Sequence, residues 1–178
     1  MAINMLPYEQ GYLDGLCGVY SVINATRLLV NNISEEECMK LFEKCLTHVE
    51  QRKRLSKAIT TGISKSDLSS ILKNVVMVKY PIARQNPFRG VDDIGVDDFF
   101  GEIQSFLNED SKRTVIAGLI GNGWDHWTVI KSISPKRVML FDSALMKTIN
   151  ISRCALKKTS KKKPYKLELK ETFFLYGR

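Results

Sequence analysis

The sequence predicts an α+β fold in which N-terminal helices pack on a C-terminal antiparallel sheet. Helical periodicity prevails in the first part of the 178-residue chain, whereas runs of β-branched and apolar residues typical of strands prevail after residue 113. Helices and strands that are segregated in this way are typical of α+β proteins. Because 44% of the residues are hydrophobic, we expect residues 1–178 to form a single domain with a sizeable core.

Four helices are expected from apolar periodicity and capping signals. Their approximate ranges are 15–30, 35–50, 67–73 and 97–108. The first is apolar around most of its circumference, which is typical of a buried helix. The second begins at a capping box formed by Ser34 and Glu37, and the third is capped by Ser66. One face of the second helix carries Cys38, Leu41, Phe42 and Cys45.

Five strands are expected, and all but one follow the last of these helices. A brief strand at 75–78 leads into a proline-containing loop at 81–87. The other strands, which are rich in β-branched and apolar residues, are expected at 114–120, 127–133, 137–142 and 167–176. The short Ser134–Lys136 connection favours an antiparallel hairpin between the second and third of these strands.

The first expected helix begins with a cysteine. In the segment DGLCGVYS at 14–21, Asp14 is a favourable N-cap, which makes Cys17 the third helical residue. Its thiol would then lie among unpaired backbone N–H groups at the positive end of the helix dipole. This environment favours the thiolate, which is the nucleophilic form of cysteine. A histidine opposite Cys17 would complete a catalytic pair.

One of the two histidines of the chain is placed to form that pair. His126 follows a glycine-rich turn and begins an expected strand, and Asp142 ends the next strand. Antiparallel pairing brings the start of one strand beside the end of the next. An Asp142 carboxylate that accepts from one imidazole nitrogen would turn the other nitrogen toward Cys17, as in a catalytic triad. We expect His48, near the end of the second helix, to be structural.

The order of these residues resembles that of the papain-like cysteine peptidases, in which a helix-heading cysteine precedes a histidine and an aspartate on successive strands. The Cys-Gly-x-x-Ser helix start at 17–21 and the short chain are most similar to the C39-like branch of bacterial peptidases. The Asp-His-x-x-Val string at 125–129 is similar to the papain histidine motif. The resemblance covers most of the chain in outline, and it implies a papain-like fold.

The resemblance also implies a role for each matching residue. Cys17 is the expected nucleophile, His126 the general base and Asp142 the orienting residue. Gln10 is expected to form the oxyanion hole with the backbone N–H of Cys17, although it stands seven residues before Cys17, where the family usually has six. The implied activity is cleavage of a peptide or isopeptide bond in a protein or peptide substrate through an acyl-enzyme, with no metal and no organic cofactor.

Three other functions are open from the sequence. The same triad could transfer an acyl group to an amine, as in transglutamination. From a different class, the chain could be a basic binding module in which Cys17 is merely structural, because cysteines on apolar helices are usually buried. A third possibility is a pocket that binds a partner without catalysis.

The net charge of +8 arises from 27 basic and 19 acidic residues. Much of the excess lies in the run Lys157–Lys163, which we expect to be an exposed loop. Such a loop is either merely solvated or a docking patch for an acidic protein or nucleic acid. Two acidic pairs, Asp92–Asp93 and Asp97–Asp98, are its acidic counterpart.

The cysteine pattern predicts neither a disulfide framework nor a metal site. The four cysteines contain no Cys-x-x-Cys pair and no zinc-like spacing, and they are Cys17, Cys38, Cys45 and Cys154. The sequence also has no secretory signal and no apolar run of about 18 residues, so no membrane association is expected. A cytoplasmic location is expected, where a free thiol at Cys17 stays reduced.

Overall fold

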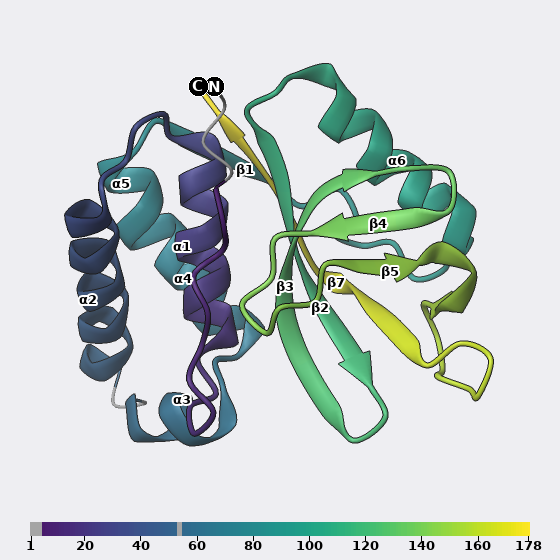
Figure 1. Ribbon diagram of the computed structural model, residues 1–178, viewed down its shortest axis with the longest axis horizontal. Coiled ribbons are helices and arrows are strands. Elements are labelled where there is room, and N and C mark those ends of the chain that lie inside the picture. Colours follow the sequence, from purple (N-terminus) through teal and green to yellow (C-terminus); the bar gives the residue numbers. More distant parts are fainter. Residues whose placement is uncertain (1–4, 53–54) are drawn as a thin grey trace.

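The computed structural model describes residues 5–52 and 55–178 and has an α+β architecture (Figure 1). The helices are α1 (Cys17–Leu29), α2 (Glu35–Gln51), α3 (Leu55–Thr61), α4 (Lys65–Ile71), α5 (Met77–Lys79) and α6 (Val96–Glu109), with a π-helical turn at Leu72–Val76 and a 3₁₀ turn at Ile151–Arg153. The strands are β1 (Ile82–Gln85), β2 (Arg113–Gly121), β3 (Trp124–Ile133), β4 (Arg137–Leu140), β5 (Thr148–Asn150), β6 (Cys154–Ala155) and β7 (Tyr165–Gly177). The predicted α+β class is thus confirmed.

The strands form one twisted sheet in the order β1-β7-β2-β3-β4-β5, with β6 pairing alongside β7. All neighbours on this path are antiparallel, whereas the short β6–β7 pairing is parallel. The long strands β2, β3 and β7 form its centre. The predicted hairpin is present as β3–β4, closed by reciprocal backbone hydrogen bonds between Ser134 and Arg137.

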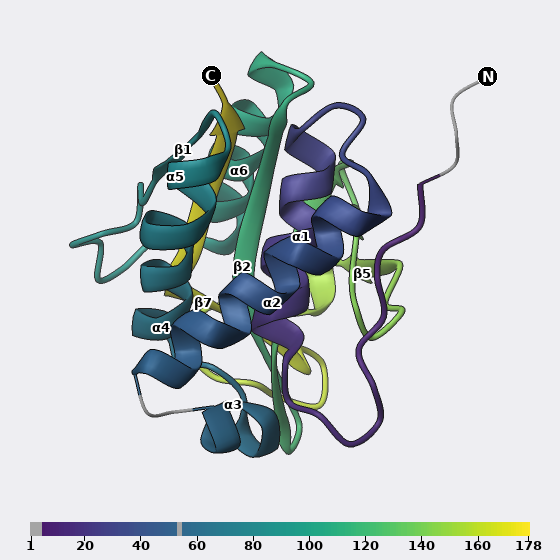
Figure 2. The ribbon, with the colours of Figure 1, turned by 90° about the vertical axis from the view of Figure 1, so that its left-hand side faces the viewer.

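The two faces of the sheet bury different helices. Ile116, Val129 and Phe173 are paired across β2, β3 and β7, and they face the helical cluster that contains α1. The residues that precede or follow them in each strand point to the other face, because side chains alternate across a strand. That second face is covered by the phenylalanine-rich side of α6. Figure 1 shows α1 and α6 on opposite sides of the sheet, and Figure 2 shows α2 and α4 outside α1.

The second helix follows its sequence signals closely. Ser34 and Glu37 form the predicted capping box, in which each side chain accepts from the backbone N–H of the other residue. Cys38 and Cys45 are buried on the face toward the core. His48 Nε2 lies 2.8 Å from Ser70 Oγ, so this histidine joins α2 to α4.

Three predictions about the middle of the chain, at 67–73, 75–78 and 81–87, are wrong. The helix expected at 67–73 begins at Lys65, because Ser64 rather than Ser66 forms the capping box with Asp67. The residues at 75–78 are helical, since burial of apolar side chains along α4 and the π-helical turn overrides their β propensity.

The proline-containing loop expected at 81–87 instead contains β1, an edge strand that pairs with the end of β7. One strand therefore precedes α6, as expected, but it is formed by Ile82–Gln85 instead of residues 75–78. The short elements α3, β5 and β6 are additional to those predicted. Within residues 5–52 and 55–178, no helix combines the length and the apolar character needed to cross a bilayer.

Candidate active site

Cys17 is the first residue of α1, not the third as predicted. The predicted N-cap, Asp14, lies outside the helix: its Oδ1 accepts from Leu16 N–H at 3.0 Å and its Oδ2 from Gly11 N–H at 2.8 Å. The residue at the cap position is Leu16, whose carbonyl accepts the first helical hydrogen bond, from Tyr20 N–H. The N–H groups of the first turn of α1 therefore point toward Cys17 without a partner among the described residues. The favourable field at the cysteine arises without a side-chain cap.

The start of α1 packs tightly on β3 because Gly18 has no side chain. A Cβ on Gly18 would lie 2.5 Å from Ile63 Cγ1 and 3.0 Å from Trp127 Cδ1. The close approach lets Trp127 N–H donate to Cys17 Sγ at 3.5 Å. Ser21 Oγ, one helical turn further, donates to the Trp127 carbonyl at 2.8 Å. The backbone next to His126 is thus attached to α1 through both the N–H and the carbonyl of Trp127.

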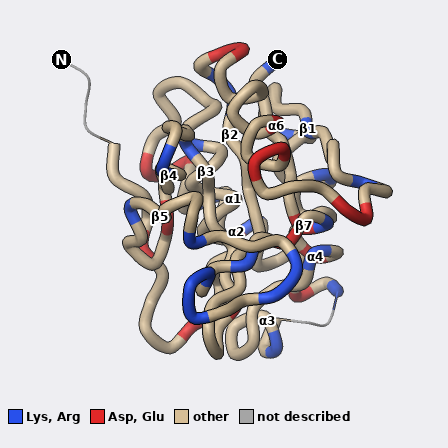
Figure 3. Tube along the Cα trace, turned by 90° about the vertical axis from the view of Figure 1, so that its right-hand side faces the viewer, with Lys and Arg blue, Asp and Glu red and all other residues tan. Residues whose placement is uncertain are grey.

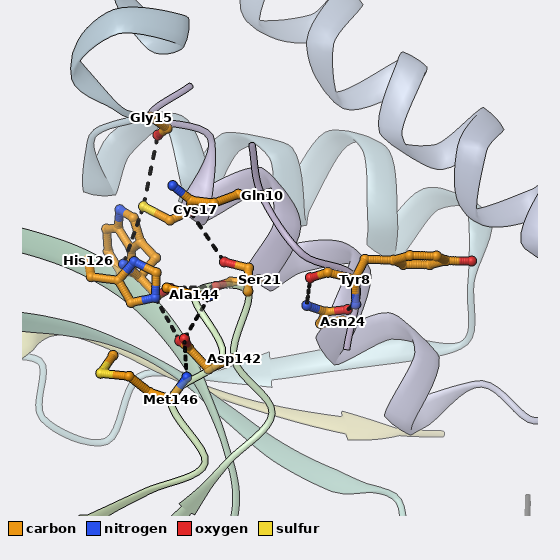
Figure 4. A network of polar contacts seen from close by, with 12 residues as sticks. Tyr8, Gln10, Gly15, Cys17, Ser21, Asn24, His126, Asp142, Ala144 and Met146 are labelled. Carbon is orange, nitrogen blue, oxygen red and sulfur yellow. Dashed lines mark hydrogen bonds and ion pairs between the residues drawn. The ribbon is translucent and has the colours of Figure 1, made fainter. Parts of the chain in front are cut away.

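His126 lies between Cys17 and Asp142 (Figure 4). Its Nε2 is 2.6 Å from Asp142 Oδ2, which leaves Nδ1 for Cys17. The Asp142 side chain is fully buried, and its Oδ1 accepts from the N–H groups of Ala144 at 2.8 Å and Met146 at 3.3 Å. The hairpin geometry predicted from the sequence therefore brings the two residues together, although Asp142 lies just beyond the end of β4.

The surroundings of His126 favour its protonated form. Burial by itself lowers the pKa of His126, because a charged ring is poorly solvated there. Hydrogen bonds to Asp142 and Cys17, together with the electrostatic interaction with both groups, outweigh burial and raise the pKa of His126 to about 9. An imidazolium that is stable at neutral pH is the counterion that a thiolate at Cys17 requires.

Gln10 reaches the same site from the N-terminal segment. Its backbone N–H donates to the Ser143 carbonyl at 3.1 Å, and its Oε1 accepts from Ser143 Oγ at 3.4 Å. Its Nε2 donates to the Asp14 carbonyl at 3.1 Å, which uses one of the two amide hydrogens. Figure 4 shows the Gln10 side chain beside Cys17, and the second amide hydrogen has no partner among the described residues.

The N-terminal segment itself is held by Asn24 of α1. Its Oδ1 accepts from Tyr8 N–H at 2.8 Å and its Nδ2 donates to the Tyr8 carbonyl at 3.0 Å. Asn24 and Ser21 support the site; the sequence analysis quoted Ser21 only as part of the Cys-Gly-x-x-Ser helix start and did not single out Asn24. A signal was present, because polar residues stand at positions i+4 and i+7 from Cys17, on the same face of a largely apolar helix.

A cleft of about 380 Å³ opens at these residues. Gln10, Cys17 and His126 line it, together with the loop after α3 and parts of β2, β3 and β7. Its walls also include three carboxylate residues, which are Asp125, Glu168 and Glu171. The thiol, the imidazole and a carbonyl of a bound chain could therefore meet at one place.

The other cysteines differ from Cys17 in their surroundings. Burial raises the pKa of the Cys45 and Cys154 thiols to about 12 and also raises that of Cys38. They therefore stay protonated at neutral pH and are poor nucleophiles and poor metal ligands. In the part of the chain that the structure describes, no group of three or more His, Cys, Asp or Glu side chains could hold a metal ion.

The lysine-rich run Lys157–Lys163 lies in an exposed loop before β7, on the side of the molecule away from α2 (Figure 3). Lys157 Nζ is 3.1 Å from a carboxylate oxygen of Asp93, and Lys170 Nζ of β7 is 3.1 Å from Asp92 Oδ1. Of the acidic pair expected to be the counterpart of this loop, Asp93 neutralises one of its lysines, whereas Asp92 pairs with β7. Both ion pairs are exposed, so each contributes little to stability.

The site combines a cysteine at a helix N-terminus, an imidazole oriented by a buried carboxylate, and a side-chain amide at the edge of a cleft. Comparison of the chain with family models, with curated proteins and with solved structures finds no match to any of them. The function must therefore be argued from the chemistry of the site itself.

Proposed function

We propose that this protein is a papain-like thiol hydrolase that cleaves peptide or isopeptide bonds. The observation that carries the proposal is the His126 imidazole, which is held between Cys17 and the buried Asp142 carboxylate at the mouth of a cleft. Three residues far apart in the sequence meet there in the order nucleophile, base and orienting group. A cysteine that served only the core would need neither the imidazole nor the open cleft.

In the proposed reaction, the Cys17 thiolate attacks the substrate carbonyl carbon and forms a tetrahedral intermediate. The His126 imidazolium then donates its Nδ1 proton to the leaving amine, the C–N bond breaks, and a thioester to Cys17 remains. Neutral His126 next takes a proton from water, which attacks the thioester and releases the acid. Asp142 keeps Nε2 protonated throughout, so that Nδ1 faces the reacting atoms.

The oxyanion of the intermediate requires donors that are already in place. The backbone N–H of Cys17 has no partner among the described residues, and the second hydrogen of Gln10 Nε2 is free of the bond to Asp14. The Asp14 carbonyl, which can only accept, identifies the Gln10 amide nitrogen as the atom on its side, and Ser143 Oγ donates to the amide oxygen. One such donor contributes roughly 10²–10³ to kcat in comparable hydrolases.

The proposal is tested by incubating the protein with an unfolded protein substrate, such as reduced and alkylated casein, and identifying the released peptides by mass spectrometry. We expect cleavage by the wild type, no cleavage by Cys17→Ala or His126→Ala, and retained cleavage by the matched control Cys38→Ala. Acid quenching should trap an acyl group on Cys17. Equal peptide release by wild type and Cys17→Ala contradicts the proposal, as does incorporation of a labelled amine without hydrolysis.

A further inference from the structure

The cleft beside Cys17 is acidic, although the chain carries a net charge of +8. Of its three carboxylate residues, Glu168 forms an ion pair with Lys166. Glu171 and Asp125 have no ion pair and no side-chain hydrogen bond among the described residues. Glu171 is only partly exposed, which makes the lack of a partner unusual, because a desolvated carboxylate is costly unless it is paired.

The fold holds Glu171 in this position. Ala117 of β2 pairs with Thr172 of β7, but the next residue, Gly118, pairs with Glu168, so β7 bulges outward between them. Thr172 Oγ1 donates to the Glu168 carbonyl at 2.9 Å and closes the bulge. The bulge directs Glu171 over Gly118, where a Cβ would lie 2.6 Å from Glu171 Oε2. A glycine at this place in β2 therefore leaves room for the carboxylate in the wall of the cleft.

The charges that face Glu171 do not neutralise it. Burial raises the pKa of Glu171, the negative charges of Glu168 and Asp125 raise it further, and Lys65 and Lys166 oppose them only from a distance. Neither lysine lies within ion-pair distance of Glu171, and Lys166 is already bound to Glu168. A cation supplied from outside would relieve this unfavourable situation.

The cleft continues past the reacting pair into a second hollow of about 240 Å³. Both hollows are lined by Asp125, Trp127 and Glu171, so the two unpaired carboxylates stand where one hollow leads into the other. Lys57 and Lys65 also line the second hollow, so a cationic side chain that extends away from Cys17 would end at the two carboxylates rather than pass beyond them.

We propose that Glu171, with Asp125, forms a subsite for a lysine or arginine side chain of the substrate, next to the bond that Cys17 attacks. This inference rests on the proposed hydrolase function, because it assigns the substrate class of the same cleft. Glu171 would accept a charge-assisted hydrogen bond from the ammonium or guanidinium group, and the part of the cleft between Cys17 and Glu171 would contain the aliphatic part of the side chain.

The first test uses two small thiol reagents of similar size, aminoethyl methanethiosulfonate, which is cationic, and hydroxyethyl methanethiosulfonate, which is neutral. The ratio of their rates at Cys17, divided by the same ratio for free mercaptoethanol, reports the cation preference of the cleft. We expect a preference of about 10-fold or more in the wild type, because an acidic cleft concentrates cations. Glu171→Gln should reduce the preference to near that of the free thiol, and 1 M salt should reduce it in the wild type.

A matched control removes one negative charge elsewhere. Glu102 is exposed on α6, so Glu102→Gln should keep the preference of the wild type. An equal rate ratio in wild type, Glu171→Gln and Glu102→Gln overturns the subsite. If instead neither reagent modifies Cys17, while a denatured sample reacts, the hydrolase proposal itself fails.

The second test uses a peptide library in which each position is varied, cleaved by the wild type and by Glu171→Gln. We expect lysine and arginine to be enriched at one position beside the cleaved bond, by about 10-fold over citrulline, which has the shape of arginine without its charge. The enrichment should be lost in Glu171→Gln while neutral peptides are still cleaved. Cleavage with no preference for a basic residue, or a preference that survives in Glu171→Gln, refutes the subsite and leaves the hydrolase function standing.

Discussion

Replacing Asp142 with asparagine should lower the pKa of His126. The structure raises that pKa from the ordinary 6.5 to about 9, and Asp142 contributes both a hydrogen bond and a charge to the increase. At about 1.4 kcal/mol per pKa unit, the protonated ring is favoured by about 3 kcal/mol. In Asp142→Asn, the amide would retain its oxygen at the N–H groups of Ala144 and Met146 and turn an N–H toward Nε2 of the ring. That contact opposes the protonated form, so we expect the pKa to fall by roughly 1–3 units.

The chain is well suited to this measurement because it has only two histidines. NMR titration of the protein labelled with ¹⁵N at histidine gives one curve for each ring, and His48→Gln assigns the curves. We expect the His126 ring to titrate near pH 9 in the wild type and clearly lower in Asp142→Asn. An unchanged midpoint in the variant would refute the reasoning, because the 2.6 Å contact between His126 and Asp142 would then have no electrostatic effect.

Three further substitutions test the support of the site. Ser21→Ala removes a buried hydrogen bond to the Trp127 carbonyl and should lower the free energy of unfolding, measured by urea denaturation, by about 1–3 kcal/mol. An unchanged free energy of unfolding would show that the carbonyl finds another donor. Gly18→Ala places a methyl group 2.5 Å from Ile63 and should cost about 1–3 kcal/mol; full stability would show that α1 can move away from β3. Glu171→Gln removes an unpaired carboxylate whose pKa is raised by burial. At neutral pH the melting temperature of the variant should therefore equal or exceed that of the wild type, and a clear fall would reveal a structural partner of Glu171.

The parts of the site that depend on neighbouring segments could be predicted from the sequence. The His126–Asp142 contact follows from a short connection between two strands, because antiparallel pairing fixes which ends meet. The meeting of Cys17 with His126 spans more than a hundred residues, so no local pattern fixes it; it was expected from the chemistry of a cysteine at a helix start and from the resemblance to papain-like peptidases. That resemblance also led to Gln10, which the structure places in the cleft despite the unusual spacing.

Other features depend on contacts that no local pattern reveals. Asp14 was predicted to be the N-cap, but its carboxylate accepts from backbone N–H groups of the turn before α1, and the helix begins at Cys17. The valine-rich stretch at 75–78 has strand propensity, yet it continues the helical segment whose residues Leu68, Ile71, Leu72 and Val76 are buried, although Val78 itself is exposed. Glu171 was read only as part of a strand, since the bulge that turns it into the cleft arises from the pairing of β7 with β2.

The central claim is that Cys17 and His126 form a thiolate–imidazolium pair. The most direct test is the pH dependence of Cys17 alkylation by iodoacetamide in the wild type and in His126→Ala, followed by mass spectrometry of the Cys17 peptide. The buried thiols of Cys45 and Cys154, with pKa raised to about 12, should not react and serve as internal references. We predict rapid reaction of Cys17 below about pH 7 in the wild type and its loss in His126→Ala, because an ordinary cysteine is largely protonated below pKa ~8.5. Reaction of Cys17 only at high pH, with the same profile in both proteins, would contradict the claim.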